Sequence, residues 1–400
     1  MQKNKLNWKL YAVVFFIIAL ALLHHYGTTY TGFAASAPEK NVAVEANITT
    51  GKTNSTILPT ASTSTTSSNE EEQAFTILAG ESSGNQITSF ALPLVENVTL
   101  NATSPQNLTS DNLTLHFDVF DADGDSVKNI TDWRLWNGTD FESIAVLNMP
   151  FENHSSASST AIDYSTFGNN GTVVSAVFNA TGGKDGKGAY TFTSSGNQII
   201  VPDSSELSFG NGTQDFPFTI TAWINAKSTS GNPIISKYSS GEPGVPTNAE
   251  YVLQLAAGKL FLHLFNGGSI SANIGAEGSS TLSTNQWYFI AASYDGSSLP
   301  NGIKLYVNGV EESVTTSSAG SYVAMNNTSQ NVTIGRLFSG SESTFNGEID
   351  GLQVFHLNLS GKQIQTLYEN RTNLIINEET SIDETWQACV TPNDGFSDGT

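Results

Sequence analysis

The 400-residue sequence contains a single cysteine, Cys389, and only 16 basic residues against 37 acidic ones. One cysteine excludes a disulfide within the chain, so stability has to come from apolar cores, bound metal or attached glycans. The formal charge of -21 opposes a nucleic-acid partner, because such partners are bound by basic surfaces that displace counterions. We therefore expect no nucleic-acid binding, and instead a soluble surface protein or a cation-binding protein.

The sequence also lacks the common catalytic patterns. No Ser-His-Asp, Cys-His or phosphate-loop arrangement is present, and the six histidines are scattered. Nothing in these patterns indicates an enzyme.

The N-terminus has the order of a secretory signal. Lysines before residue 10 precede the apolar run 10–23, and a small-residue stretch ends at Ala37. Two outcomes stay open for residues 1–37: a cleaved signal peptide, or an uncleaved apolar helix that anchors the protein with its N-terminus in the cytoplasm. In both cases the rest of the chain is extracellular, at the cell surface.

Residues 38–74 are rich in Ser and Thr and poor in apolar residues, which predicts a disordered stalk. About seventeen Asn-x-Ser/Thr acceptors follow the export signal or lie within the stalk. Together with that signal they predict an N-glycosylated surface protein. The principal predicted sites are Asn97, Asn101, Asn107, Asn112, Asn129, Asn137, Asn170, Asn211, Asn331 and Asn358.

From about residue 145 to 370 the sequence alternates short apolar strands with Gly, Asn, Asp and Ser turns. Only the segment beginning at Ser360 has helical spacing, with that serine as the N-cap. The count of strands predicts an all-β fold, in which two antiparallel sheets pack as a jelly-roll sandwich. Trp223 and Trp287 are predicted core residues. Rings that could stack on sugars are Tyr238, Tyr251 and Tyr322.

The segments "VLNMPFEN", "DYSTFGNNGTV", "GKDGKGAYTFTSSGNQIIVPDS", "QWYFIAASYDG" and "FNGEIDGLQVFHLNLSGKQIQTLYEN" together resemble a laminin-G-like jelly roll of the concanavalin A-like lectin and glucanase superfamily. The resemblance covers residues 141–372 and follows the family order. It implies the jelly-roll fold. For function it leaves lectins, adhesion modules, passive spacers and glycosidases open.

The resemblance also implies a calcium ion between the first loop and the closing strand of the roll. Ca²⁺ takes hard oxygen ligands, and the matching positions here are Asp163, Asp350, Asn169 and Asn170. In the alternative interpretation Asp163 is a turn residue and Asp350 is solvated or hydrogen-bonded.

The closing strand carries a partial glucanase signature. "GEIDGLQ" resembles the E-x-D-x-x-E pattern of laminarinase-like enzymes, with Glu348 and Asp350 in the first two places. The last place holds Gln353, which cannot exchange a proton as a carboxylate does. Strand alternation would put Leu352 on the same face as these acids. We expect no enzyme.

A second acidic motif is "DADGDSVKNITD". Its acids stand at the first, third, fifth and twelfth places of a calcium loop, but its glycine is misplaced and its flanks read as strands. An acidic turn with at most weak cation binding is the favoured interpretation. The four acids are Asp121, Asp123, Asp125 and Asp132.

Residues 75–140 resemble the first strands of an immunoglobulin-like sandwich, which needs about seven strands. The later strands are supplied by residues 373–400, where Trp386, Ala388 and Val390 alternate onto one face. The predicted architecture is thus an immunoglobulin-like sandwich with the jelly roll inserted, and the alternative is two small β units flanking the roll. Cys389 is expected to face away from that core, and the last residues to be a truncated turn.

The resulting prediction is an exported, N-glycosylated cell-surface protein that is not an enzyme. Its laminin-G-like domain would mediate carbohydrate binding or adhesion, with calcium as a candidate cofactor. The partner would be a carbohydrate or an extracellular protein, plus the membrane if the N-terminal segment is uncleaved. The alternatives are a structural spacer or surface-layer module and, third, a glycoside hydrolase.

Overall fold

The computed structural model describes the backbone of residues 43–49 and, with side chains, residues 91–229, 231–239, 248–267, 270–338, 341 and 343–400. The predicted signal segment 1–37 lies outside the described residues. Within the predicted stalk, Ala43–Thr49 forms strand β1. Among the described residues, no helix has the length and apolar content needed to cross a membrane.

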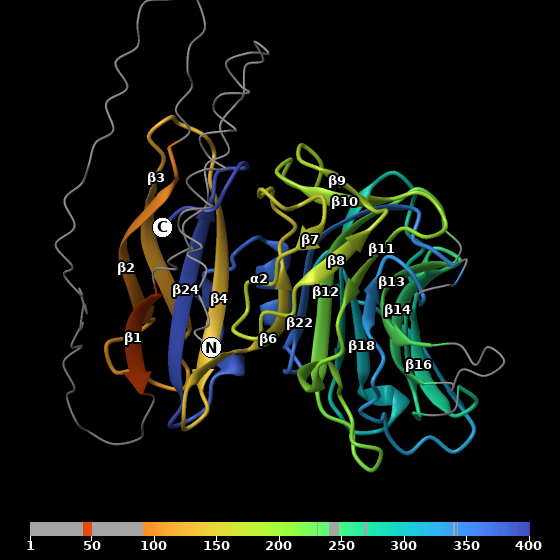
Figure 1. Cartoon of the computed structure of the whole chain (residues 1–400). Helices are drawn as coiled ribbons and strands as arrows, with labels where there is room; N and C mark the ends of the chain where they lie inside the picture. Colours follow the sequence, from red (N-terminus) through yellow and green to blue (C-terminus); the bar gives the residue numbers. More distant parts are fainter. Residues whose placement is uncertain are drawn as a thin grey trace, which may run out of the picture. The chain divides into compact units, whose positions relative to one another are not determined.

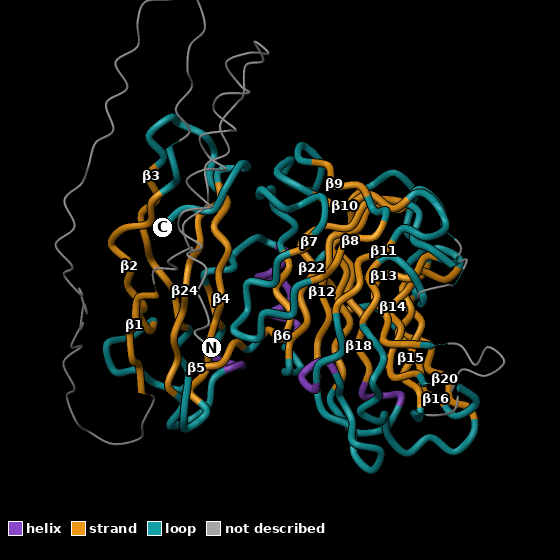
Figure 2. Tube along the Cα trace, viewed as in Figure 1, coloured by secondary structure: helices purple, strands orange, loops and turns teal. Residues whose placement is uncertain are grey.

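The described strands form four sheets, which Figures 1 and 2 show as two pairs. The eight-stranded sheet has the order β19-β18-β17-β12-β22-β10-β9, and β6 also pairs with β22. Its strands are β6 (Ala145–Met149), β9 (Val177–Asn179), β10 (Ala189–Phe192), β12 (Phe218–Ala226), β17 (Trp287–Tyr294), β18 (Ile303–Val307), β19 (Val310–Glu311) and β22 (Gly347–Phe355).

The nine-stranded sheet has the order β20-β16-β15-β14-β13-β21-β11-β8-β7. Neighbouring strands pair antiparallel, as the hairpins predicted from the sequence require. Its strands are β7 (Thr160–Ala161), β8 (Gly171–Val174), β11 (Gln198–Val201), β13 (Asn232–Tyr238), β14 (Ala249–Ala256), β15 (Lys259–Phe265), β16 (Asn273–Gly278), β20 (Val314–Ala319) and β21 (Val332–Ile334).

The inner faces of these two sheets enclose the main apolar core, which confirms the predicted jelly-roll sandwich. Alternate residues of each strand supply it, such as Ile220 and Ile224 of β12 and Leu262 of β15. Trp223 lies on the other face of β12, half-buried against Phe289 with ring centroids 5.4 Å apart. It packs there against an apolar cluster that contains Phe289, so it lies in a core other than the main one. Trp287 is half-buried.

Two smaller sheets pack together as a small sandwich beside the roll. One has the order β1-β24-β4-β5 and the other β2-β3-β23. The chain completes β5, makes the whole jelly roll, and returns at β23 to pair with β3. The strands are β2 (Leu94–Ala102), β3 (Leu113–Phe120), β4 (Lys128–Trp136), β5 (Phe141–Ser143), β23 (Leu374–Ile375) and β24 (Thr385–Asn393). The immunoglobulin-like assignment of this sandwich stays a prediction.

Strand β24, near the C-terminus, pairs with strands β1 and β4 from the N-terminal part of the sequence. It pairs antiparallel with β4, from Trp386 opposite Leu135 to Asn393 opposite Lys128. Trp386, Ala388 and Val390 are all buried in the core of the small sandwich. Cys389 alternates onto the opposite face, as expected, yet it is only 8% exposed.

Helix α2 (Gly361–Tyr368) covers the outer face of the eight-stranded sheet, meaning the face turned away from the main core. Ser360 caps it by accepting a hydrogen bond from the Gln363 N–H, as predicted. Its residue Ile364 belongs to an apolar cluster that also contains Phe355 of β22 and Trp386 of the small sandwich. One continuous apolar layer therefore covers this face. Three 3₁₀ turns complete the described helices: η1 (Ser205–Leu207), η2 (Pro300–Gly302) and η3 (Asn377–Glu379).

Candidate functional site

Two buried acids lie where the first strand of the roll meets its closing strand. Glu152, just after β6, is 2% exposed, and Asp350 of β22 is 5% exposed. The loop 180–188 between β9 and β10 covers them, and the Lys184 N–H donates a hydrogen bond to Asp350 Oδ2 at 2.8 Å. Lys128 forms ion pairs with Glu152 and Asp185. We call Glu152, Asp350, Asp185 and Lys128 the carboxylate cluster.

Glycines let the loop approach these acids closely. Gly183 has φ +84, and a Cβ there would lie 2.1 Å from the Gly188 carbonyl oxygen and 2.8 Å from Asp350 Oδ2. A Cβ on Gly188 would lie 2.1 Å from the Phe151 carbonyl oxygen. Both contacts are closer than any side chain tolerates, so the cover over the cluster depends on glycine at these positions.

Glu152 is the least satisfied acid of the cluster. Both of its carboxylate oxygens are buried and accept no hydrogen bond, and Lys128 Nζ stands 3.6 Å from Oε1. Burial raises the pKa of Glu152 to about 8 and that of Asp350 to about 7. A buried carboxylate without donors is costly, and a divalent cation with oxygen ligands would relieve that cost.

The cluster accordingly has part of the donor set that Ca²⁺ requires. The orphaned oxygens of Glu152 and the carboxylate of Asp350 are hard ligands. Within the described part of the chain, no three His, Cys, Asp or Glu side chains are grouped so as to hold a metal ion. A cation at Glu152 and Asp350 would therefore take its remaining ligands from backbone carbonyls or water.

Asp163, the first predicted calcium ligand, lies in a different network. Its Oδ1 accepts hydrogen bonds from the N–H groups of Asn148 at 2.8 Å and Ser165 at 3.0 Å. Its Oδ2 accepts from the Ser165 hydroxyl at 2.7 Å and the Asn169 N–H at 2.7 Å. This arrangement matches the alternative interpretation, in which Asp163 organises the turn.

The two predicted asparagine ligands lie near Asp163 and not in the carboxylate cluster. Asn170 Oδ1 accepts the Asp163 N–H at 2.8 Å, and Asn169 Nδ2 donates to the Val146 carbonyl at 2.9 Å. The sequence thus brought Asp163 together with both asparagines, but the hydrogen-bond partners of Asp163 and Asp350 do not overlap. Glu152, which the sequence analysis did not single out, is the acid that lies near Asp350.

The acidic motif at residues 121–132 forms a turn between β3 and β4, as favoured. Asp121 Oδ1 accepts the N–H groups of Asp123, Gly124 and Asp125. Asp132 lies away from them in β4, where its Oδ2 accepts hydrogen bonds from Arg134 Nε at 2.6 Å and the Ser143 hydroxyl at 2.9 Å. The four acids do not surround one point.

A bulge in β22 rearranges the partial glucanase signature. Thr221 of β12 pairs with Gln353, but Trp223 pairs with Asp350, so β22 carries one extra residue here. Gly351 takes this position with φ +56. Leu352 consequently faces the main core, which corrects the expectation that it shares a face with Asp350.

The predicted glycosylation sites differ in accessibility. Side chains of the first group are exposed: Asn97, Asn101, Asn137, Asn170, Asn211, Asn331 and Asn358. Those of the second group are half-buried: Asn107, Asn112 and Asn129. Glycosylation stays a prediction for both groups, and the second group presents less surface to a modifying enzyme.

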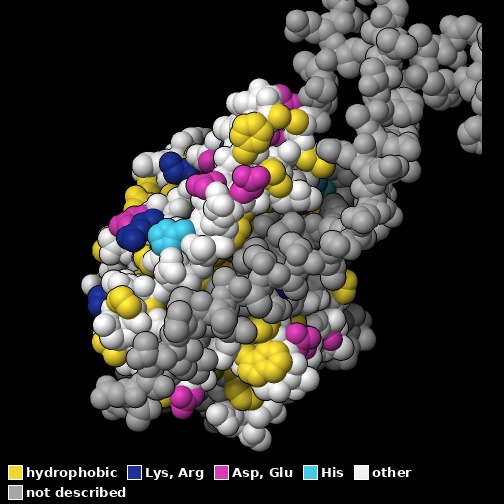
Figure 3. Space-filling view, turned by 90° about the vertical axis from the view of Figure 1, so that its left-hand side faces the viewer, with side chains coloured by type: hydrophobic (Ala, Val, Ile, Leu, Met, Phe, Trp, Pro, Cys, Tyr) yellow, Lys and Arg dark blue, Asp and Glu magenta, His cyan; other side chains and the backbone are white. Residues whose placement is uncertain are grey.

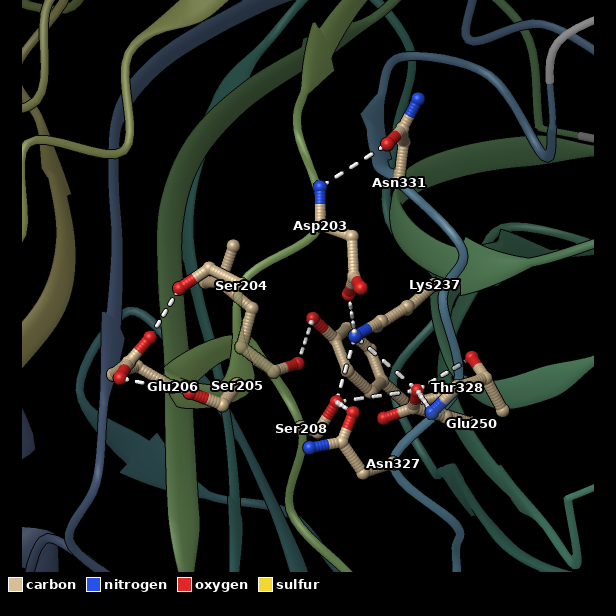
Figure 4. A network of polar contacts seen from close by, with 12 residues as sticks. Asp203, Ser204, Ser205, Glu206, Ser208, Lys237, Glu250, Asn327, Thr328 and Asn331 are labelled. Atoms are coloured by element: carbon tan, nitrogen blue, oxygen red, sulfur yellow. Dashed lines mark hydrogen bonds and ion pairs between the residues drawn. The ribbon is translucent and has the colours of Figure 1, made fainter.

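A buried lysine organises one end of the roll. Lys237 is 0% exposed, and its Nζ lies 2.7 Å from Asp203 Oδ1, 2.6 Å from the Ser208 hydroxyl and 3.2 Å from Glu250 Oε1. Figure 4 shows these groups converging with Thr328, whose N–H and hydroxyl both donate to Glu250. Because the charge is paired and hydrogen-bonded, this network holds the surrounding loops on β13 and β14.

Five rings follow one another on the outer face of the nine-stranded sheet. Ring centroids are 3.9 Å apart for Phe261 and His263, 5.5 Å for His263 and Phe265, 5.5 Å for Phe265 and Tyr238, and 6.0 Å for Tyr238 and Phe338. All except the buried Phe265 are half-buried. We call these five residues the aromatic row.

The three tyrosines predicted to stack on sugars lie in different environments. Tyr238 belongs to the aromatic row. Tyr251 is fully buried, and the hydroxyl of Tyr322 donates to the buried Asp215 at 2.8 Å. Those two rings therefore serve the interior. Alternation on β15, with Leu262 and Leu264 inward, could have identified Phe261 and His263 from the sequence.

Comparison with known proteins agrees with the fold. Residues 193–365, which make up most of the jelly roll, match the family model described as "Concanavalin A-like lectin/glucanases superfamily". No curated protein matches the chain significantly.

Several solved structures are similar. The binding domain of Paraclostridial Mosquitocidal Protein 1 has 15% identity and a TM-score of 0.41, over 56% of this chain and 52% of that chain. The botulinum neurotoxin serotype G binding domain has 18% identity and a TM-score of 0.41, over 57% and 51%. In both cases the match spans about half of the other protein's length. Domain 4 of a GH43 extracellular arabinanase from Geobacillus stearothermophilus, in complex with arabinotriose, has 20% identity and a TM-score of 0.36, over 51% and 91%.

Proposed function

We propose that this chain is a carbohydrate-binding module, without catalytic activity, of an exported and N-glycosylated surface protein. Its superfamily is described by two activities, lectins and glucanases. The observation that supports binding over hydrolysis is the state of the partial glucanase signature on β22. A retaining glucanase needs two carboxyl groups that reach the substrate about 5 Å apart.

The β22 acids do not meet this requirement. Asp350 is 5% exposed beneath the loop 180–188, so a glycan cannot reach it. Glu348 is flanked by amides, with Asn179 Nδ2 at 3.4 Å and Asn225 Nδ2 at 3.5 Å. Gln353 donates to Asn148 Oδ1 at 3.0 Å and has no proton to exchange. These contacts support binding without hydrolysis as the function of this domain.

Calcium enters the proposal as a structural ligand. Glu152 and Asp350 would hold the ion, because both carboxylates are buried and the carboxylate oxygens of Glu152 accept no hydrogen bond, which favours a cation. The ion would supply only positive charge there, fixing the loop 180–188 on the closing strand. Export and glycosylation rest on the N-terminal apolar run and the Asn-x-Ser/Thr acceptors of the sequence.

A glycan array tests the proposed function. The full chain, labelled at an exposed lysine, is incubated on neutral and acidic glycans with calcium and again with a chelator. We expect binding to at least one glycan and no release of reducing ends from it. Absence of binding to every glycan would overturn the proposal and leave a spacer role, whereas released reducing ends would show a hydrolase.

A further inference from the structure

We propose that the aromatic row is the ligand-binding surface of this module, and that its ligand is an extended neutral glycan chain. This inference rests on the proposed function and adds to it the face and the ligand class. The row lies on the outer face of the nine-stranded sheet, whose strands β13, β14, β15 and β16 lie side by side (Figure 2).

The backbone fixes the position of the rings. Leu260, Leu262 and Leu264 of β15 point into the main core, so Phe261, His263 and Phe265 point outward from the same strand. Phe265 is 8% exposed and packs with Val252 of the neighbouring strand. The rings are thus held before any ligand arrives, which reduces the ordering entropy that binding must overcome.

The row continues beyond β15 onto neighbouring elements. Tyr238 at the end of β13 contacts Phe265, and Phe338, which follows β21, contacts Tyr238. Successive contacts from three elements give a continuous series of ring faces and edges. Such a series suits a chain ligand, because successive sugar units can each place an apolar face against a ring.

Polar groups border the aromatic row on both sides. In the sheet register, Phe261 stands between Gln254 of β14 and Glu277 of β16, and both side chains are half-exposed. Lys259 Nζ pairs with Glu277 Oε1 at 3.0 Å. Rings flanked by a few hydrogen-bonding groups are the usual lining of a site that binds a polyhydroxylated ligand.

Charge favours a neutral glycan over an acidic one. The chain has a formal charge of -21, which repels polyanions. The row itself is uncharged near neutral pH, because burial lowers the pKa of His263 to about 4. No Lys or Arg stands in the row to pair with a carboxylate or sulfate group.

Another exposed aromatic pair lies outside the aromatic row. On the face in Figure 3, apolar side chains form small groups among polar and charged ones over the part that is not grey. Exposed Trp136 of the small sandwich contacts one ring, Phe141, at 5.1 Å. This pair offers a matched control, because it is aromatic and exposed but lies outside the aromatic row.

Affinity electrophoresis of the full chain through gels containing soluble neutral polysaccharides, namely β-glucan, xylan, arabinan and mannan, tests the inference. Phe261→Ala and Tyr238→Ala should each weaken binding about tenfold, the usual effect of one aromatic contact in a binding site. Phe261→Leu should weaken binding similarly, although leucine keeps most of the side-chain volume. Phe261→Tyr, which keeps an aromatic ring, should bind like the wild type. Trp136→Ala should leave affinity unchanged.

The outcomes separate the two proposals. If the wild-type chain binds no polysaccharide, the proposed function fails and the row has no ligand of this class. If the wild type binds but the Phe261 and Tyr238 variants retain its affinity, only the assignment of the surface is overturned. Preferential binding to an anionic polysaccharide would overturn the ligand class. Thermal unfolding of Phe261→Leu, expected within a few degrees of the wild type, shows that lost affinity is not lost folding.

Discussion

The two sheets of the jelly roll share one core but have opposite outer surfaces. The outer face of the eight-stranded sheet lies under α2 and the small sandwich, and the acids Glu152 and Asp350 are buried beside it. The outer face of the nine-stranded sheet carries the half-exposed aromatic row. The covered face can therefore contribute stability and hold a cation, and the open face can contribute binding.

This division also bears on the partial glucanase signature. The partial signature lies on β22, at the covered face, where insertion of the roll into the small sandwich brings apolar residues such as Phe355 against α2. A ligand site on that face would require the apolar layer to open. The aromatic row, the proposed binding surface, is accessible on the open sheet without any such rearrangement.

The largest expected effect comes from the covered side. Trp386→Ala should destabilise the protein by about 3–5 kcal/mol, because Trp386 is 1% exposed and contacts Trp133 edge-to-face at 6.4 Å. Urea unfolding measures the change. Trp136→Ala, at a residue 43% exposed, should change stability by less than about 0.5 kcal/mol. An equal loss in both variants would contradict the covered core.

Calcium bound at Glu152 and Asp350, beside the covered face, should stabilise the protein, and its removal should destabilise it. At a concentration about 100-fold above its dissociation constant, calcium should stabilise the wild type by about 2.7 kcal/mol, seen as a higher melting temperature that a chelator reverses. Glu152→Gln should abolish this increase, because an amide is a poorer and neutral ligand for the ion. Glu142→Gln, at an exposed residue, should keep it. A calcium effect that survives Glu152→Gln would place the ion elsewhere.

The sequence predicted local features more reliably than distant contacts. Alternation identified Trp386, Ala388 and Val390 as one face of a strand that packs in a core. This was possible because the period of two can be read from residues that are neighbours in the sequence. Asp163 and Asn170, which the sequence analysis named together as candidate calcium ligands, do lie together, because they hydrogen-bond within one loop.

Contacts between distant segments were less accessible. Glu152 and Asp350 meet only because β6 pairs with β22 and the loop 180–188 folds over both. The bulge at Gly351 likewise depends on its pairing with β12 and reversed the expected face of Leu352. A burial that results from tertiary packing leaves little trace in local sequence.

The loop over the carboxylate cluster gives a smaller effect. Gly183→Ala should destabilise the protein by about 1–3 kcal/mol, because the new Cβ would meet the Gly188 carbonyl oxygen at 2.1 Å in addition to an unfavourable φ of +84. Gly186→Ala is the matched control: its φ is +81 and its Cβ would meet nothing within 4 Å. The difference between the two in thermal unfolding isolates the close approach. Equal effects would show that φ alone matters.

The smallest expected effect is a pH dependence of stability that arises from His263, on the open face. Burial lowers the pKa of His263 to about 4 in the folded protein, against roughly 6.5 when unfolded. Below pH 6.5 the unfolded chain takes up a proton that the native state refuses, so stability is complete above pH 6.5 and falls as pH approaches 4. Because the ring is partly exposed, we expect this loss of stability to be less than about 1 kcal/mol.

His263→Phe keeps a ring in the aromatic row but cannot titrate, so its melting temperature should exceed that of the wild type by more at pH 5 than at pH 8. The raised pKa of Asp132, about 6 through burial, acts in the opposite direction but equally in both proteins. A difference that does not vary with pH would mean that His263 is not buried enough to resist protonation.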